Sequence, residues 1–288
     1  MMRRAMWTGM CAALALGTLA SAQTPPAGQG GAGARPPRRQ FDLTTPRPIP
    51  ARDSVWIEEL TWMEVRDEMA AGKTTAIIAA GSTEQNGPYV PTGKHIYVLR
   101  ATAESIARTL GNALVAPLIP FEPGGTSTTP GTLQVRPETY EALVEDEAES
   151  LKANGFRHVV LIGDSGGNQR GLANVAKKLA AAWAGSTTTI HFIAEYYASW
   201  EAADAAWGSL GVPKTMEEGI HDDYSVNAII ATVDPNKIRF EERRGAGKAS
   251  INGQSLLPLE TTVANGKKLV EIRTKLAVDA IRKALATP

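Results

Sequence analysis

Three short, largely apolar runs, each leading through a polar segment into a helical pattern, constrain this chain more than any other feature. They span residues 74–80, 158–162 and 188–194. Runs of this length are typical of strands that are buried on both faces. Because such strands alternate here with helices, the sequence predicts an α/β fold in which a mainly parallel sheet is covered by helices on both faces.

Helical spacing of apolar residues and start and stop signals predict the remaining elements. Pro137 favours the first turn of a helix, and Asn154 followed by Gly155 ends it. We expect helices at 57–71, 96–110, 137–152, from the 163–169 segment to about 183, 224–233 and 266–285, and a further strand near 113–116.

The first 22 residues have the pattern of a secretory signal peptide. Arg3 and Arg4 precede an apolar run at 10–19 that is too short to span a bilayer, and a small-x-small cleavage site follows at Ala20-Ser21-Ala22. Cleavage there predicts a periplasmic or secreted protein that has no membrane contact once the signal is removed. Retention as a membrane anchor is the alternative interpretation.

Residues 23–51 are dense in Pro, Gly and Arg, which predicts a flexible linker before a single folded domain at 52–288. Cys11 is the chain's one cysteine and lies in the leader. The mature protein therefore lacks disulfides, a thiolate nucleophile and cysteine-ligated zinc. Thirty basic residues balance thirty acidic ones, so no net charge attracts nucleic acid, and we expect a small-molecule or peptide substrate.

The candidate site follows from the predicted sheet. In open α/β sheets, ligands bind beyond the carboxyl ends of the strands. That rule selects the loops at 81–95, 163–169 and 195–200, which hold much of the chain's concentrated polar chemistry.

Four segments, in order, resemble motifs of the creatininase (creatinine amidohydrolase) family. Together they cover most of residues 60–238 and read GSTEQNGPYVPTGKH, PGTLQVRPET, GFRHVVLIGDSGGN and HDDYSVNAIIATVDPNKI. The resemblance implies a three-layer α/β/α fold with a mainly parallel sheet, a homo-oligomer, and divalent metal ions that activate water to open an amide or similar C–N bond.

Compared position by position with the family's motifs, this chain keeps only part of the metal-binding set. Glu84 is kept, and so is His221, to which the family assigns proton transfer. Asn86 stands where the family has a histidine, and His95 stands where it has an aspartate. In the glycine-rich loop, Ser165 replaces a histidine, and Gly167 stands where creatininase itself has a second-metal glutamate.

Two carboxylates with one or two imidazoles can hold a divalent ion and leave a position open for water. We therefore expect one zinc, manganese or iron ion, with Asp222 and Asp223 able to restore part of a second position. The expected metal ligands are Glu84, His95, Asp164 and Asp222, the expected catalytic residues are His221 and Ser165, and the expected substrate-binding residues are Asn86, Asn168, Gln169 and Tyr196.

Two other functions stay open at this point. The GDSGG loop fits the G-x-S-x-G nucleophile elbow, in which Ser165 would attack the substrate with His221 as its base. The altered ligand positions also fit a non-catalytic relative that binds a small molecule. The candidate side chains could also have purely structural roles. Asp164 and Ser165 are typical of a strand-to-helix turn, and Tyr196 is typical of a buried aromatic residue that only packs.

Overall fold

The computed structural model describes residues 42–208 and 221–286. The predicted signal peptide, 1–22, and most of the predicted linker lie outside the described residues. The described residues from Thr45 onward form one compact unit, and residues 42–44 are grouped apart from it. In the described part of the chain, no helix has both the length and the apolar character that a membrane crossing requires.

A four-stranded parallel sheet lies at the centre of the larger unit, with the strand order β2-β1-β5-β6. Its central strands are fully or almost fully buried, as continuous apolar runs predict. The four strands are β1 (Thr75–Ala80), β2 (Ala113–Val115), β5 (His158–Gly163) and β6 (Thr189–Phe192).

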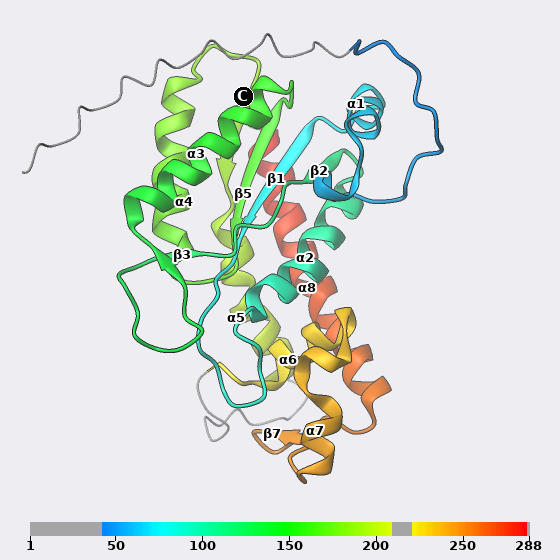
Figure 1. The fold of residues 1–288 in the computed structure, drawn as a ribbon, viewed down its shortest axis with the longest axis vertical. Helices are drawn as coiled ribbons and strands as arrows, with labels where there is room; N and C mark the ends of the chain where they lie inside the picture. The colour runs from blue at the N-terminus through cyan, green and yellow to red at the C-terminus, as the bar shows by residue number, and fades with distance from the viewer. Residues whose placement is uncertain (1–41, 209–220, 287–288) are drawn as a thin grey trace, which may run out of the picture. The chain divides into compact units, whose positions relative to one another are not determined.

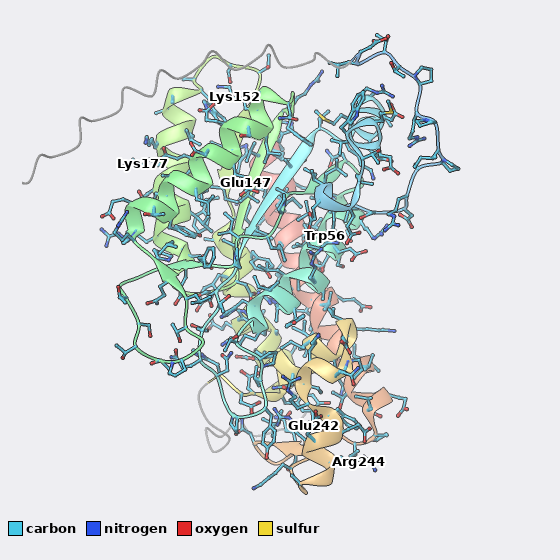
Figure 2. All side chains as sticks on the ribbon, in the orientation of Figure 1. Trp56, Glu147, Lys152, Lys177, Glu242 and Arg244 are labelled. Carbon is cyan, nitrogen blue, oxygen red and sulfur yellow. The ribbon has the colours of Figure 1, made fainter. Side chains whose placement is uncertain are left out.

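Helices cover both faces of this sheet, and the prediction of a three-layer α/β/α fold is confirmed. On one face, Ile78 and Leu161 pack against α3 (Pro137–Ala153) and α4 (Asn168–Ala182). On the other face, Ile77 and Val160 pack against side chains of three further helices. Figures 1 and 2 show these layers and the side chains between them; the further helices are α2 (Lys94–Leu110), α5 (Ala194–Gly208) and α8 (Leu259–Leu285).

The remaining elements are short, and most of them lie outside the central sheet. Strand β3 pairs with β4 in parallel, and β7 pairs with β8 antiparallel. The elements are η1 (Ile57–Glu59), α1 (Trp62–Ala70), β3 (Glu122–Pro123), β4 (Gln134–Val135), α6 (Tyr224–Val233), η2 (Pro235–Ile238), α7 (Phe240–Gly245), β7 (Ser250–Ile251) and β8 (Gln254–Ser255).

Three predicted elements differ most from the structure. The helix expected at 57–71 is divided, because Thr61 caps α1 through a capping box with Glu64. The last helix is longer than expected and begins at Leu259 rather than Gly266. Residues 195–200, expected as a loop, form the first turns of α5.

The register of β1 against β5 brings two chemically important loops to one edge of the sheet. Ala80 pairs with Gly163, so both strands end at the same level. Immediately beyond them, the Asp164 backbone N–H donates to the Ala80 carbonyl over 2.8 Å. The polar segments that follow the two strands are therefore held side by side at the carboxyl end of the sheet.

Replacing Gly266 with alanine is expected to destabilise the packing of α6 against α8. A Cβ at Gly266 would lie 1.9 Å from the Ala228 carbonyl oxygen, which is backbone and cannot rotate away. Overpacking of this kind lowers the free energy of unfolding by about 1–3 kcal/mol or more. Gly245→Ala on α7 is the matched control, because a Cβ there meets no atom within 4 Å. Equal stability of the two variants in urea unfolding would contradict this prediction.

Candidate active site

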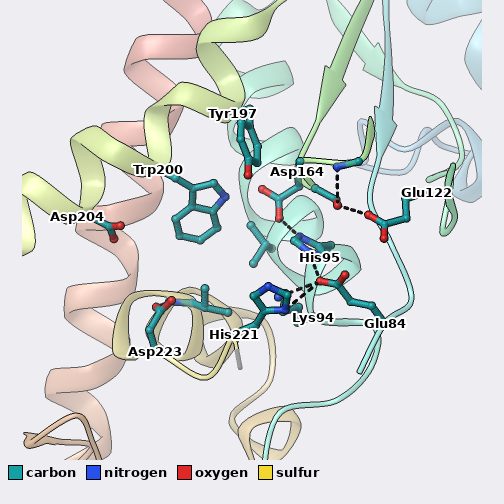
Figure 3. Close-up of a pocket in the computed structure, with 15 residues that line it drawn as sticks. Glu84, Lys94, His95, Glu122, Asp164, Tyr197, Trp200, Asp204, His221 and Asp223 are labelled. Atoms are coloured by element: carbon teal, nitrogen blue, oxygen red, sulfur yellow. Dashed lines mark hydrogen bonds and ion pairs between the residues drawn. The ribbon is translucent and has the colours of Figure 1, made fainter. Parts of the chain in front are cut away.

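A cavity of about 470 Å³ opens at the carboxyl end of the parallel sheet, where charged side chains from several elements meet (Figure 3). Its floor includes residues from the β1–α2 and β5–α4 connections, and one wall comes from α5 and the start of α6. The lining residues are Glu84, Lys94, His95, Val98, Glu122, Asp164, Ser165, Gly166, Gly167, Tyr197, Trp200, Asp204, His221, Asp223 and Val226.

The His95 imidazole lies between two carboxylates. Its Nδ1 is 2.7 Å from Asp164 Oδ2, and its Nε2 is 2.9 Å from Glu84 Oε1. Because a carboxylate only accepts hydrogen bonds, both contacts are satisfied together when both ring nitrogens carry protons. Burial alone would lower the pKa of His95, but the hydrogen bonds that it donates to Asp164 and Glu84 outweigh burial and raise the pKa. The arrangement therefore favours an imidazolium cation.

A second buried cation contacts Glu84: the ammonium of Lys94, which precedes His95 in the sequence. Lys94 Nζ lies 3.1 Å from Glu84 Oε1, and both side chains are largely buried. Burial would raise the pKa of Glu84, but the hydrogen bond from His95 and the charge of Lys94 lower it to about 2. Burial likewise lowers the pKa of Lys94, and the charge of Glu84 opposes that shift. The Glu84 carboxylate is therefore ionised and compensated on two sides.

Asp164 is paired with an arginine from the last helix. Arg273 Nη2 donates to Asp164 Oδ1 over 2.8 Å, and neither side chain is exposed to solvent. The Tyr196 hydroxyl donates to the same oxygen over 3.1 Å, and the guanidinium stacks 3.8 Å from the centroid of the Trp200 ring. Burial would raise the pKa of Asp164, but the charge of Arg273 and the hydrogen bond from His95 hold it well below its usual range.

His221 faces Glu84 from the segment before α6. Its Nδ1 lies 3.4 Å from Glu84 Oε1, and 42% of its side chain is exposed. Burial and then the charge of Lys94 lower the pKa of His221, which favours the neutral imidazole at pH 7. Its backbone has a positive φ of 58°, a conformation that is uncommon outside glycine and is enriched in asparagine, aspartate and histidine. The next residue but one, Asp223, caps α6 by accepting from the Val226 N–H.

Ser165 lies in the turn between β5 and α4, and its hydroxyl donates to Glu122 Oε2. Glu122 belongs to β3 and was not among the predicted site residues. Its carboxylate occupies space left by Gly167, because a Cβ there would lie 2.6 Å from Glu122 Oε2. Glycine at position 167 leaves room for a side chain from another element. This glycine was the one feature of the sequence that indicated such a contact.

Four polar side chains expected to bind substrate, those of Asn86, Asn168, Gln169 and Tyr196, are not among the described residues that line the cavity. Asn86 donates to the carbonyls of Glu84 and Pro91, so it braces the β1–α2 loop. The other three side chains hydrogen-bond within the fold: Asn168 to the Gly81 carbonyl and the Ser165 N–H, Gln169 to the Gly163 and Ser165 carbonyls, and Tyr196 to Thr102 and Asp164.

Asp222 lies apart from the other expected metal ligands. It forms an ion pair of 2.9 Å with Arg243, and both side chains are completely buried. Asn227 donates to the same carboxylate over 2.9 Å, and Arg243 stacks against the ring of Tyr89. This network anchors the residue next to His221.

The arrangement of donors does not fit a divalent metal ion. A metal-bound histidine needs an unprotonated ring nitrogen that faces the ion, whereas both nitrogens of His95 face carboxylate oxygens. Both oxygens of Asp164 and Oε1 of Glu84 already accept from side-chain cations. In the part of the chain that the structure describes, no three His, Cys, Asp or Glu side chains are grouped so as to hold a metal. Asn86 Oδ1 is buried without a partner there, but one amide oxygen is not a site.

Comparison with known proteins identifies relatives of this chain. A model of the family described as creatininase, creatinine amidohydrolase, matches residues 58–275. A creatinine amidohydrolase from Pseudomonas putida is 30% identical over 115 residues, which are 38% of this chain and less than half, 44%, of that enzyme. A mycofactocin precursor peptide peptidase from Mycolicibacterium smegmatis is 21% identical over 230 residues, 72% of this chain and 84% of that protein.

Solved structures share the fold at low sequence identity. A crystal structure of creatininase superimposes with a TM-score of 0.60 at 18% identity, covering 82% of this chain and 100% of that one. An Mn form of creatininase also has a TM-score of 0.60, at 19% identity, covering 81% of this chain and 99% of that one.

Proposed function

Because this chain belongs to the creatininase family, we propose that it is a hydrolase that adds water across an amide or other C–N bond of a small molecule. The observation that carries the proposal is the pairing of a half-exposed imidazole, His221, with a buried carboxylate, Glu84, across a cavity at the carboxyl end of the sheet. We further propose export after loss of residues 1–22 and assembly as a homo-oligomer.

His221 is the proposed general base. Its Nδ1 faces Glu84, which favours the tautomer that carries the proton on Nδ1 and leaves Nε2 as the acceptor. Nε2 then takes a proton from water as the water oxygen attacks the carbonyl carbon. The same imidazolium returns that proton to the leaving nitrogen as the C–N bond breaks. The products are a carboxylic acid and an amine, or one ring-opened molecule if the substrate is cyclic.

Two features of the cavity are suited to the negative charge that develops on the carbonyl oxygen. Gly166 and Gly167 line the cavity directly before α4, a helix of 15 residues whose positive dipole end attracts anions, while the N–H groups of Gly167, Asn168 and Gln169 already donate within the turn. The Lys94 ammonium also lines the cavity. Fixed donors of this kind stabilise a tetrahedral intermediate more strongly than water does, because they need no reorganisation.

The expectation of one zinc, manganese or iron ion stays a prediction for this chain. The solved Mn form of creatininase supports a divalent ion in a relative with this fold. The cationic partners of Glu84 and Asp164 oppose it in this chain, and no step of the proposed reaction requires an ion.

The proposal is tested with a panel of cyclic amides, linear N-alkyl amides, lactones and short peptides. We expect the folded protein to hydrolyse at least one amide-containing class, detected by mass spectrometry as the gain of one water. A folded, monodisperse protein that binds a panel member but turns over none would favour the non-catalytic binding function instead.

Ser165→Ala is expected to leave most of the activity in place. The Ser165 hydroxyl donates to Glu122, whereas His221 lies against Glu84, so the pair required of a serine hydrolase is not assembled. We expect kcat to fall by less than about tenfold, whereas loss of a true nucleophile costs several orders of magnitude. Labelling of wild type by a fluorophosphonate at Ser165, with Ser150→Ala still labelled and Ser165→Ala not, would establish serine catalysis instead.

A further inference from the structure

Three buried cations and three buried carboxylates are grouped at the base of the cavity, and Figure 3 draws all of them except Arg273, which contacts Asp164. The carboxylates are Glu84, Glu122 and Asp164, each no more than 9% exposed. The cations are Lys94 and His95, which are 4% and 8% exposed, and Arg273, which is fully buried. The formal charges of this buried set therefore cancel when His95 is an imidazolium.

The other buried charges among the described residues have separate roles. Glu64 belongs to the capping box of α1, and Asp222 forms its own ion pair with Arg243. Asp204, His221 and Asp223 also line the cavity but are only partly buried. The six remaining buried charged groups therefore compensate one another's charges and are not needed to compensate charges elsewhere in the fold.

The contacts show how this balance is built. His95 donates to Glu84 and Asp164 at once, Lys94 reaches Glu84 from the preceding position, and Arg273 reaches Asp164 from α8. Tyr196 and Trp200 stack on the Arg273 guanidinium and fix it in place. Each cation therefore contacts a carboxylate oxygen, and a metal ion would have to compete with it for the same oxygen.

We infer that Lys94, His95 and Arg273 together replace divalent metal ions in this site, so that the carboxylates Glu84 and Asp164 are held by fixed side-chain cations and the protein keeps no resident metal. The oxygens that a divalent ion would need, both of Asp164 and Oε1 of Glu84, already contact fixed side-chain partners, and two further positive charges beside Lys94 and Arg273 in a buried site are strongly unfavourable. The inference concerns the site of the proposed function, but its charge argument does not depend on catalysis.

Metal content of the full chain, purified without an affinity tag, tests this inference. The protein is incubated with Zn²⁺ or Mn²⁺, passed through a desalting column and analysed by inductively coupled plasma mass spectrometry. We expect well below one ion per chain and no rise in the melting temperature with either metal. About one or more tightly held ions per chain would overturn the inference.

A double variant, Asn86→His with His95→Asp, restores the family's residue types at two positions and removes one cation. We expect it to retain about one zinc ion per chain in the same assay. His191→Asp on β6 is the matched control, because His191 contacts Thr189 and does not line the cavity. A folded double variant that holds no more zinc than this control would contradict the assignment of His95 as the group that excludes the metal.

A measurement on wild type keeps the inference testable if the double variant does not fold. Nitrogen-15 NMR of labelled histidine, with His158, His191 and His221 assigned by single asparagine substitutions, reports the protonation of His95 directly. We expect both ring nitrogens of His95 to carry protons at pH 7 and to be unaffected by zinc. An unprotonated nitrogen that shifts on adding zinc would overturn the inference. None of these readouts measures turnover, so failure of the proposed hydrolase function would be seen separately.

Discussion

His221→Asn is expected to lower kcat by about 100- to 10,000-fold, the usual contribution of a positioned general base. Asparagine is chosen because it tolerates the positive φ of 58° at this position, so the backbone is preserved. It cannot accept and return a proton, and KM should change much less than kcat. The measurement is steady-state kinetics on the best substrate from the panel.

His158→Asn is the matched control for this variant. His158 begins β5, and its Nδ1 contacts the Thr189 hydroxyl away from the cavity. Both variants should unfold at the wild-type temperature within error. If His221→Asn kept kcat within about twofold of wild type, His221 would not be the base, and the proposed proton transfer would be wrong.

Arg273→Met is expected to lower the free energy of unfolding by about 3–5 kcal/mol, because it leaves the Asp164 carboxylate buried without its arginine. The guanidinium also donates to Ser199 Oγ over 2.9 Å and stacks on Trp200, so several contacts are lost together. Urea unfolding at pH 7 measures the loss. Tryptophan fluorescence should change in the folded state, since Trp200 loses its stacking partner.

Arg282→Met provides the control on the same helix. Arg282 makes an exposed contact of 3.3 Å with the Thr109 carbonyl, and its replacement should change stability by no more than about 0.5 kcal/mol. Adding Asp164→Asn to Arg273→Met should recover part of the loss, because the unpaired charge is removed with its partner. A loss below about 1 kcal/mol for Arg273→Met would show that Asp164 finds compensation elsewhere.

The layers and the position of the site were predictable from local sequence patterns. Apolar runs specify β1 and β5, and parallel pairing places the ends of these strands together. For that reason Glu84 and Asp164, chosen from two strand-end loops, both lie within hydrogen-bonding distance of His95 at the start of α2. Glu84 and Asp164 follow their strands closely, so sequence spacing was sufficient to place them.

The partners of these side chains were not predictable in the same way. Arg273 is 109 positions from Asp164, and its place on a helical face gives no sign of which carboxylate it reaches. Glu122 belongs to a strand of two residues, too short to produce a pattern. Asp222 adjoins His221 in sequence, but the αL conformation of His221 and the buried Arg243 turn it away from the cavity. The partners of the site carboxylates therefore depend on long-range charge pairing, which local sequence patterns do not predict.

Turnover of the panel is compared between untreated protein and protein that has been exhaustively chelated and shown to be free of metal. We expect hydrolysis of an amide-containing substrate at the same rate in both samples. Absence of turnover in both folded samples would contradict the hydrolase function. Turnover that disappears on chelation and returns with added Zn²⁺ or Mn²⁺ would support the hydrolase function. The same result would contradict the inference that Lys94, His95 and Arg273 replace the metal.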